Sequence, residues 1–289
     1  MKYALISLLL LSTSLANAQS KILENQVLNS KILPYEVNYS IYLPPDYDQS
    51  QREYPIVYLL HGYTDDDSGW VQFGEVKRLV DAGIASGDIP PMVIAMPDGK
   101  VTWYLNDIGG TERWEDMFVQ EFIPEIENKY RIRKKKEFRG ISGLSMGGFG
   151  SLRLSMAYPD LFAACAAYSS AVWTAEEFKN MNGNAYEQRF GKIFGSGLKG
   201  DARINDHWKA NSVLDMVRTR NLDELKRVRY YFDCGDDDFL AIGNSTLHIE
   251  MTKRGLPHQY RVRDGSHSWS FWRTSLPIGL KFIGESFRR

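Results

Sequence analysis

The chain has 289 residues, which at roughly 150 residues per domain predicts one large domain or two small ones. Its 35 lysines and arginines nearly balance 36 aspartates and glutamates, and a formal charge of −1 argues against the basic surface that nucleic-acid binding needs. Hydrophobic residues make up 43% and charged residues 25%, a composition typical of a globular protein with a sizeable core. Two cysteines, without paired Cys or His spacings, predict neither a disulfide framework nor a zinc site.

Residues 1–18 have the pattern of a secretory signal peptide. Lys2 gives a positive start, residues 4–11 are apolar apart from one serine, and residues 16–18 place small side chains at the cleavage positions. The apolar run is well short of the roughly 20 residues that cross a bilayer, and no other segment approaches that length. We therefore expect a mature chain that starts at Gln19, is secreted or periplasmic, and does not insert stably into a membrane.

The remaining sequence alternates predicted strands with predicted helices. Residues 34–43 alternate loosely, with Val37, Tyr39, Ile41 and Leu43 at every second position, which indicates an early, partly exposed antiparallel strand. Short runs that are apolar on both faces follow, as is typical of buried strands in a parallel sheet. These runs are Ile56–Leu60, Met92–Met96, Phe138–Ile141, Leu161–Tyr168 and Tyr230–Phe232.

Helical segments lie between these strands. Large apolar residues recur every four positions over residues 114–130 and form one helix face. Residues 238–253 and 268–287 are further helical candidates. This alternation predicts an α/β fold, in which helices cover both faces of a mostly parallel central sheet. The sequence has no internal repeat and no low-complexity linker, so we expect residues 19–289 to form a single domain.

Residues 171–227 interrupt this rhythm, because they are far longer than a crossover between two strands needs. They carry several glycines and several large aromatic side chains. The segment is either a surface insertion with a small core of its own or a wall or lid over a pocket at the strand ends. Its large aromatic residues include Trp173, Phe178, Tyr186, Phe190, Phe194 and Trp208.

A G-x-S-x-G motif spans residues 143–147, with Ser145 at its centre. The motif alone is weak, but a predicted strand at 137–141 precedes it and a predicted helix at 147–158 follows it, as in a nucleophile elbow. The alternative is a phosphate-binding loop, yet residues 148–151 lack its Gly-Lys-Ser/Thr ending, and the dinucleotide glycine spacing also fails. The sequence therefore predicts that Ser145 is a nucleophile on a sharp strand-to-helix turn.

A serine hydroxyl needs a base to take its proton, and a histidine is required. In folds with this elbow the catalytic residues follow the order Ser, acid, His along the chain. His207 lies in the insertion without a motif around it, His248 fits a helical pattern, and His258 starts a short predicted strand at 258–263. His267 follows that strand in a loop just before the final helix, which is the position expected of the base.

The acid that orients His267 should follow the preceding strand. Asp236, Asp237 and Asp238 all lie there, and local physics does not separate them, because a run of aspartates is usually a solvated loop or a helix cap. Asp98 follows another predicted strand, but it comes before the serine and is out of order.

An oxyanion hole needs two backbone N–H groups that point at the developing charge. Met146 follows the nucleophile directly and is expected to supply one. Tyr63, in the loop after Leu60, is expected to supply the other, with Gly62 allowing a close approach. His61 is predicted to hold this loop in place rather than to take part in acid–base chemistry.

Five motifs in this order resemble the α/β-hydrolase esterases that include feruloyl, acetyl xylan and tributyrin esterases and the esterase D type. The resemblance covers roughly residues 40–285. It implies an α/β-hydrolase fold with the insertion placed before the acid strand, and it specifies the family but not the substrate. The motifs are Leu59-Leu60-His61-Gly62, Met96-Pro97-Asp98-Gly99, Gly143-Leu144-Ser145-Met146-Gly147-Gly148, Cys234-Gly235-x-x-Asp238 and Gly265-x-His267-x-Trp269.

The same resemblance implies roles for individual residues. It places the acid on Asp238, and it places aromatic and polar side chains near the site at Trp103, Tyr104 and Asn106. Many relatives are glycine-rich after His-Gly, whereas this chain has Tyr-Thr-Asp-Asp-Asp at 63–67, so the acyl pocket is expected to differ. The three aspartates are interpreted as a solvated acidic loop, with a Ca²⁺ site as the less favoured alternative.

The sequence leaves the roles of two pairs of residues undecided. Cys165 and Cys234 lie on strands that are candidates for neighbours, and they are either bonded or, as is more usual on buried parallel strands, free thiols. Trp269 and Trp272 lie one helical turn apart. Either both belong to the core, or Trp269 lines the pocket beside His267.

The sequence as a whole predicts a secreted serine carboxylesterase that needs no metal and no cofactor. Export and the resemblance favour acetyl or feruloyl esters of plant cell-wall carbohydrate, so the expected partner is a small-molecule or polysaccharide-linked ester. An acyltransferase or a thioesterase on the same fold is the first alternative. A non-catalytic carbohydrate-binding protein is the second, and the complete Ser, Asp and His set argues against it. No oligomeric state is predicted.

Overall fold

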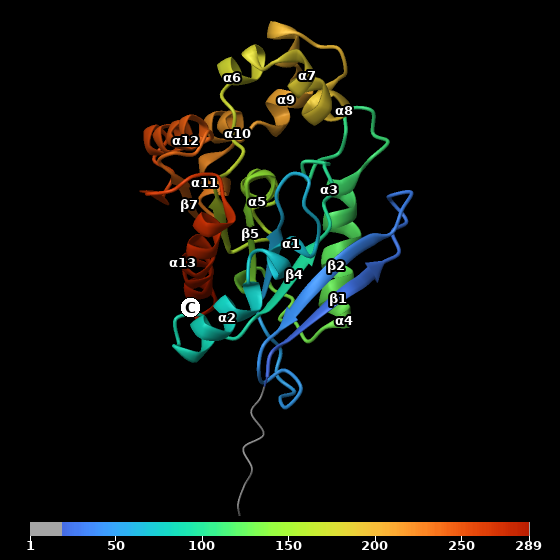
Figure 1. Ribbon diagram of the computed structural model, residues 1–289, viewed down its shortest axis with the longest axis vertical. Helices are drawn as coiled ribbons and strands as arrows, with labels where there is room; N and C mark the ends of the chain where they lie inside the picture. Colours follow the sequence, from blue (N-terminus) through green and yellow to red (C-terminus); the bar gives the residue numbers. More distant parts are fainter. Residues whose placement is uncertain (1–18, 289) are drawn as a thin grey trace, which may run out of the picture.

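The computed structural model describes residues 19–288, so the signal peptide predicted for residues 1–18 lies outside the described residues. Within them, eight strands form one sheet in the order β1-β2-β4-β3-β5-β6-β7-β8 (Figure 1). All neighbouring pairs from β4 to β8 are parallel, which confirms the mostly parallel sheet that the sequence predicts. The strands are β1 (Lys21–Leu28), β2 (Val37–Leu43), β3 (Ile56–Leu60), β4 (Val93–Pro97), β5 (Arg139–Leu144), β6 (Ala164–Tyr168), β7 (Arg229–Gly235) and β8 (His258–Arg263).

The antiparallel edge of the sheet differs from the prediction in one respect. β2 pairs antiparallel with β4, as expected, but it is almost entirely buried rather than partly exposed. Two features bury it: β1, which the sequence did not predict, covers its outer edge, and its side chains meet helices on both faces, as where Tyr39 packs on Phe122 and the Tyr42 hydroxyl donates to Asp81. β1 carries polar residues at Glu24, Asn25 and Gln26, its register shifts between Leu23 and Gln26, and it therefore lacks a regular alternation.

Helices cover both faces of the sheet. α2 and α13 pack on one face, while α4, α5 and α12 pack on the other (Figure 1). α13 continues through Pro277 and ends at Phe287. The helices are α1 (Gly69–Gln72), α2 (Val76–Ala85), α3 (Trp114–Met117), α4 (Ile123–Lys129), α5 (Met146–Ala157), α6 (Ala175–Asn180), α7 (Gly183–Tyr186), α8 (Lys192–Phe194), α9 (Asp206–Asn211), α10 (Val213–Thr219), α11 (Leu222–Leu225), α12 (Ala241–Lys253) and α13 (Trp269–Phe287). Shorter helical turns are η1 (Phe118–Phe122), η2 (Lys136–Phe138), η3 (Glu187–Gly191) and η4 (Gly200–Arg203).

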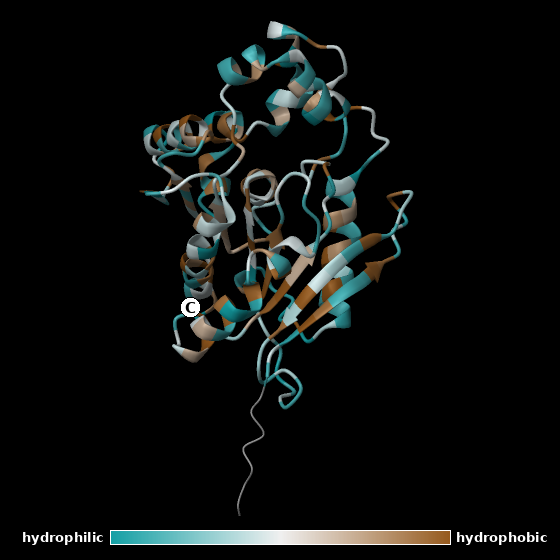
Figure 2. Cartoon of the chain, viewed as in Figure 1, coloured by the Kyte–Doolittle hydropathy of each residue, from teal (hydrophilic) through white to brown (hydrophobic). Residues whose placement is uncertain are grey.

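The segment 171–227 folds into the short helices α6 to α11. Figure 1 shows α6, α7, α8 and α9 as a group beyond the end of the sheet, while α10 packs back against α5 and α12. Figure 2 shows mostly hydrophilic residues on α6, where only Phe178 among the larger side chains is apolar. The aromatic rings of the segment pack on one another, for example Phe178 on Phe190 at 5.0 Å between centroids. The insertion therefore has an aromatic core of its own.

The two cysteines are free thiols, and both are buried. Their strands β6 and β7 are neighbours, but Cys165 pairs in register with Tyr230 and not with Cys234, so the sulfur atoms lie at different heights in the sheet. Burial raises the pKa of Cys165 to about 12, which keeps this thiol protonated and unreactive.

No helix among residues 19–288 is both long enough and apolar enough to cross a lipid bilayer.

Candidate active site

Ser145 lies at a sharp turn between β5 and α5. Its backbone has φ 53° and ψ −114°, a positive-φ conformation that residues other than glycine rarely adopt. A Cβ atom at position 147 would lie 2.4 Å from the carbonyl oxygen of Leu60, so the turn requires Gly147. The Ser145 N–H donates to the Tyr168 carbonyl at 2.9 Å and ties the turn to β6. The strained turn thus holds the serine hydroxyl at the carboxyl end of β5.

His267 lies between Ser145 and Asp238. Its Nε2 atom is 3.0 Å from Ser145 Oγ, and its Nδ1 atom is 2.9 Å from Asp238 Oδ2. Asp238 is buried and also accepts a hydrogen bond from the Leu240 N–H at 2.9 Å. Burial raises the pKa of Asp238, but His267 and the Leu240 N–H together outweigh burial and hold that pKa below its ordinary value. The structure therefore brings an ionised carboxylate, an imidazole and a hydroxyl into one hydrogen-bonded line.

The two other aspartates of the run are exposed, and neither contacts His267. Asp236 Oδ1 accepts a hydrogen bond from the Gly265 N–H at 3.0 Å, and the Asp237 N–H donates to the Gly265 carbonyl at 3.0 Å. These two bonds fix the loop that carries His267. The helix predicted from residue 238 starts only at Ala241, because Asp238 belongs to the loop.

The remaining histidines have other contacts. His61 accepts a hydrogen bond from the Gly99 N–H on Nε2 at 2.8 Å, and it thereby joins the loop after β3 to the loop after β4. His207 Nε2 lies 3.1 Å from the Asn106 carbonyl, and His248 Nδ1 lies 2.7 Å from His258 Nε2.

A cavity of about 570 Å³ opens beside Ser145. Its walls include Tyr63 from the loop after β3, Trp103 from the loop after β4, and Trp269 from the start of α13. Trp272 also reaches the wall, with its ring centroid 4.9 Å from that of His267, so both tryptophans of α13 line the pocket. The full lining is Gly62, Tyr63, Thr64, Asp65, Trp103, Leu144, Ser145, Ala171, Trp173, Arg189, Phe239, Leu240, His267, Ser268, Trp269 and Trp272.

Asn106, which the resemblance places near the site, is not among the residues that line this cavity, and its role in substrate binding stays a prediction. Its Oδ1 atom accepts a hydrogen bond at 3.2 Å from the N–H of Asp116, a residue of α3. Trp103 and Tyr104 both have φ 58°, and two successive positive-φ residues turn the chain sharply. Trp103 consequently faces the cavity, whereas the Tyr104 hydroxyl donates to the His61 carbonyl at 2.8 Å.

Sequence reasoning did not identify Phe239 as part of the site. Its ring centroid lies 4.6 Å from that of His267, and the side chain is 61% exposed at the mouth of the cavity. Because Phe239 directly follows Asp238 in the chain, the sequence could have predicted that it lies near the active site. Trp173 and Arg189 reach the cavity from the insertion, which is therefore a wall of the site as well as a unit with its own core.

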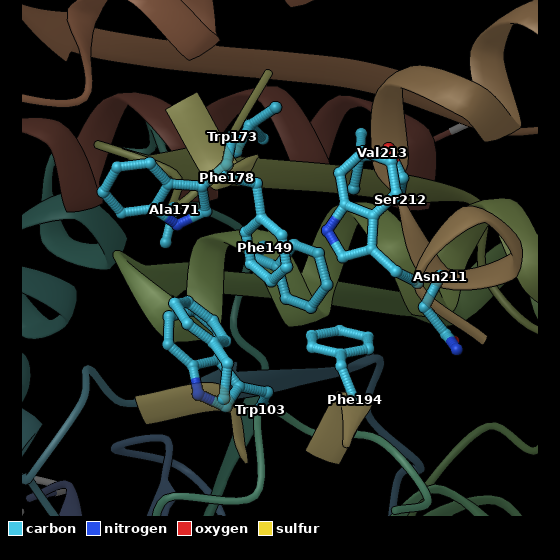
Figure 3. A pocket seen from close by; sticks show the side chains of 12 residues that line it. Trp103, Phe149, Ala171, Trp173, Phe178, Phe194, Asn211, Ser212 and Val213 are labelled. Atoms are coloured by element: carbon cyan, nitrogen blue, oxygen red, sulfur yellow. The ribbon is translucent and has the colours of Figure 1, made fainter. Parts of the chain in front are cut away.

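A second, much smaller cavity of about 20 Å³ lies behind this wall. Figure 3 shows its lining, in which Trp103, Phe178, Phe194 and other apolar side chains converge. Trp103, Ala171 and Trp173 line both cavities and separate them. The smaller space is about the size of one water molecule and is bounded almost wholly by apolar groups, so it marks close packing of the insertion rather than a ligand site.

Of the two expected oxyanion-hole donors, Tyr63 lines the larger cavity beside Ser145, and Met146 follows Ser145 directly in the chain. Met146 is the first residue of α5, and the first N–H groups of a helix have no carbonyl partner within it. Tyr63 lines the cavity, and its ring packs on Trp103 at 5.8 Å between centroids.

The acidic segment after Tyr63 is only partly a solvated loop. Asp67 is buried and accepts a hydrogen bond from the Ser40 hydroxyl at 2.7 Å, while Asp66 Oδ1 accepts from the Ser68 N–H at 2.8 Å. Over residues 19–288, no group of three or more Asp, Glu, His or Cys side chains has the arrangement of a metal site.

Comparison with known proteins places the chain in a family. The model of the Esterase family matches residues 30–283. An esterase of Mycobacterium tuberculosis is 27% identical over 79% of this chain and 52% of its own sequence, so the chain spans about half the length of that relative. The acetyl esterase of Caldicellulosiruptor saccharolyticus is 26% identical over 94% of this chain and 95% of its own.

A solved structure of a ferulic acid esterase superposes with a TM-score of 0.81 and 31% identity, over 94% of this chain and 100% of that one. The chain therefore belongs to the Esterase family and has the α/β-hydrolase fold of serine carboxylic-ester hydrolases.

Proposed function

We propose that the protein hydrolyses carboxylic esters with Ser145 as nucleophile, His267 as the proton-transferring base and Asp238 as the acid that orients His267. The observation that carries the proposal is the unbroken line of hydrogen bonds from Asp238 Oδ2 to His267 at 2.9 Å and from His267 to Ser145 Oγ at 3.0 Å. An ionised Asp238 favours the Nδ1–H tautomer of His267, which leaves Nε2 free to accept the serine proton.

In the first half-reaction, Ser145 Oγ attacks the ester carbonyl carbon while its proton moves to His267 Nε2. The tetrahedral intermediate then breaks the bond to the alcohol, which leaves with the proton from His267. In the second half-reaction, water gives a proton to His267 and attacks the acyl-enzyme, and Ser145 regains its hydrogen as the acid departs. The N–H groups of Met146 and Tyr63 are proposed to stabilise the oxyanion in both steps.

The proposed substrates are acetyl or feruloyl esters on plant cell-wall carbohydrate. Two relatives support this class by name, an acetyl esterase and a ferulic acid esterase. A cavity of about 570 Å³ is far larger than an acetyl group, and indole rings from Trp103, Trp173 and Trp269 form much of its wall. This apolar, aromatic lining suits a feruloyl group or a sugar ring packed against an indole.

We also propose that residues 19–289 act as one domain, with 171–227 as a wall of its active site, and that the protein is exported. The lysine, apolar run and small residues of 1–18 support export. Amino-terminal sequencing of protein recovered from the periplasm or the medium tests this proposal. A chain that starts at Gln19 supports it, and a full-length chain confined to the cytoplasm contradicts it.

The test of the activity compares initial rates of the chain from Gln19 on acetylated xylan, on methyl ferulate and on p-nitrophenyl acetate, with Ser145→Ala as control. A strong preference for one natural ester identifies the acyl group. Activity on p-nitrophenyl acetate alone supports the triad but contradicts the proposal that the substrate is a cell-wall ester. Acyl transfer to added xylose, seen as an esterified sugar, would favour an acyltransferase. No hydrolysis and no labelling by a fluorophosphonate would contradict the esterase proposal.

A further inference from the structure

Two charged side chains line the cavity beside Ser145 and take no part in the proposed mechanism. They are Asp65, in the loop that also carries Tyr63, and Arg189, in the insertion. Within residues 19–288, neither side chain makes a hydrogen bond or an ion pair, and the two do not pair with each other. Arg189 is exposed, so water solvates its guanidinium. Asp65 is half-buried, and its environment is the more informative of the two.

Asp65 differs from the two aspartates that follow it. Asp66 binds the N–H and the hydroxyl of Ser68, and Asp67 binds the hydroxyl of Ser40. Both therefore have partners within the protein, and neither lines the cavity. Asp65 is the member of the run that faces the cavity and has no donor of its own among the described residues. Its carboxyl group packs against the backbone of Gly69, where a Cβ atom would lie 2.8 Å from it.

A half-buried carboxylate without a donor is unfavourable in the empty site. Burial raises the pKa of Asp65 above its ordinary value, because water no longer fully solvates the charge. A ligand that excludes the remaining water increases that cost unless it supplies a donor of its own. The site therefore favours a ligand with a hydrogen-bond donor at this place and disfavours the same ligand without one.

The surroundings of Asp65 indicate which donor fits. Trp70, next to Gly69, packs edge-on against Trp269 at 5.3 Å between centroids, and Trp269 lines the same cavity. A ring that packs on Trp269 and carries a hydroxyl group fits both neighbours, because the ring meets an indole and the hydroxyl meets a carboxylate.

We propose that Asp65 determines specificity by accepting a hydrogen bond from a hydroxyl group of the bound ester. This inference rests on the proposed esterase function and deepens it. The hydroxyl has two possible sources, the phenol of an aromatic acyl group or a ring hydroxyl of the sugar that carries the ester. A carboxylate binds either in the same way, so the experiment must separate them.

The experiment uses two pairs of substrates that differ only in a hydroxyl group. The first pair is methyl ferulate and methyl 3,4-dimethoxycinnamate, in which the phenol is methylated. The second pair is a monoacetylated methyl xyloside and its analogue with the free hydroxyls methylated. The ratio of kcat/KM between the two members of each pair is measured for the wild type, Asp65→Ala and Asp65→Asn. Asp66→Asn is the matched control, since it keeps an oxygen for Ser68 at a neighbouring position outside the cavity.

We expect the wild type to prefer the hydroxylated member of one pair by about 10-fold or more. In Asp65→Ala that ratio falls towards one, and in Asp66→Asn it stays at the wild-type value. The pair that responds identifies the source of the hydroxyl. A wild-type ratio near one in both pairs, or a ratio that Asp65→Ala and Asp65→Asn leave unchanged, overturns the inference.

Failure of the inference can be told from failure of the proposed function. Labelling by a fluorophosphonate and hydrolysis of p-nitrophenyl acetate report on the triad without any substrate hydroxyl. If the wild type gives both signals but shows no hydroxyl preference, the role of Asp65 is wrong and the esterase stands. If it gives neither signal, the esterase proposal fails, and the inference fails with it. A variant that is still labelled has a folded active site, which excludes misfolding as the cause of a changed ratio.

Discussion

Ser145 Oγ lies 3.0 Å from His267 Nε2, although 122 positions separate the two residues in the chain. The topology of the sheet explains this proximity. Ser145 follows β5, Asp238 follows β7 and His267 follows β8, and these strands are parallel members of one sheet. The carboxyl ends of parallel strands meet at one edge, which is where ligand sites form in open α/β sheets.

Replacing Ser145 with alanine tests the nucleophile. We expect Ser145→Ala to fold normally and to lose at least roughly 10³-fold in kcat, because no other group can form the acyl-enzyme. The measurement is the rate on p-nitrophenyl acetate, with circular dichroism to check the fold. Activity near the wild-type level in a preparation free of other esterases would remove Ser145 from the mechanism.

Replacing the same residue with glycine tests the strain in the turn. Ser145→Ala keeps a Cβ atom at φ 53°, whereas Ser145→Gly removes it. Such strain costs about 1–3 kcal/mol, which Ser145→Gly relieves. The added freedom of glycine in the unfolded chain lowers the free energy of unfolding by about 0.5–1 kcal/mol and offsets part of that relief. Ser145→Gly should therefore be about 1 kcal/mol more stable than Ser145→Ala in urea unfolding. If Ser145→Gly is instead less stable than Ser145→Ala by about 0.5–1 kcal/mol, the flexibility of glycine acts alone and the turn is not strained.

The identity of the acid is tested by two neighbouring substitutions. Asp238→Asn should lower kcat/KM by roughly 10³-fold or more, since an amide no longer favours the productive tautomer of His267. Asp237→Asn should change it by no more than about twofold, because the Asp237 side chain is exposed and only its backbone holds the loop. The reverse order would mean that Asp237 is the acid.

The lowered pKa of Asp238 predicts how its contribution to stability depends on pH. The carboxyl holds its proton less tightly in the folded state than in the unfolded state. Its stabilising effect is therefore fully present above the unfolded pKa of about 3.9 and is lost as the pH falls through the lower, folded pKa. The free energy of unfolding of the wild type should exceed that of Asp238→Asn at pH 6, and the gap should close below about pH 4. A gap that widens on acidification would contradict the pKa shift.

Much of this arrangement follows from local sequence patterns. Ile56–Leu60 is a strand with the predicted ends because a strand buried on both faces needs an unbroken apolar run. Ser145 and His267 could be assigned because a strand-to-helix turn and the order of residues along the chain both constrain them. Asp238 could not be separated from Asp236 and Asp237 by local physics. All three are charged and adjacent, and only the path of the loop decides which one faces His267.

Other features depend on tertiary contacts that no local pattern encodes. The helices of the insertion are too short to be stable alone, and their aromatic rings hold them against one another. Asn106 lies outside the lining of the cavity because the two positive-φ residues Trp103 and Tyr104 redirect the chain just before it. The position of Asp65 in the cavity wall could not be predicted for a similar reason, since only the folded loop separates its side chain from those of Asp66 and Asp67.

The contact between Trp103 and the insertion leads to a final prediction. The Trp103 indole N–H donates to the Arg189 carbonyl at 2.8 Å, and the Tyr63 hydroxyl donates to the adjacent Gln188 carbonyl at 3.3 Å. Both acceptors lie in the π-helical turn η3, where the wall of the insertion meets the site. These two bonds hold the insertion against the loops that follow β3 and β4.

Trp103→Phe removes the donor to Arg189 and keeps an aromatic ring that can still pack on Phe190. The matched control is Trp173→Phe, because the buried Trp173 Nε1 has no hydrogen-bond partner among the described residues, so this change loses ring volume but no bond. We expect Trp103→Phe to be less stable than Trp173→Phe by about 1 kcal/mol, the usual net value of one hydrogen bond. Hydrogen exchange should be faster at η3 in Trp103→Phe than in the control. Equal exchange in the two variants would show that packing alone, and not the indole bond, holds this wall over the active site.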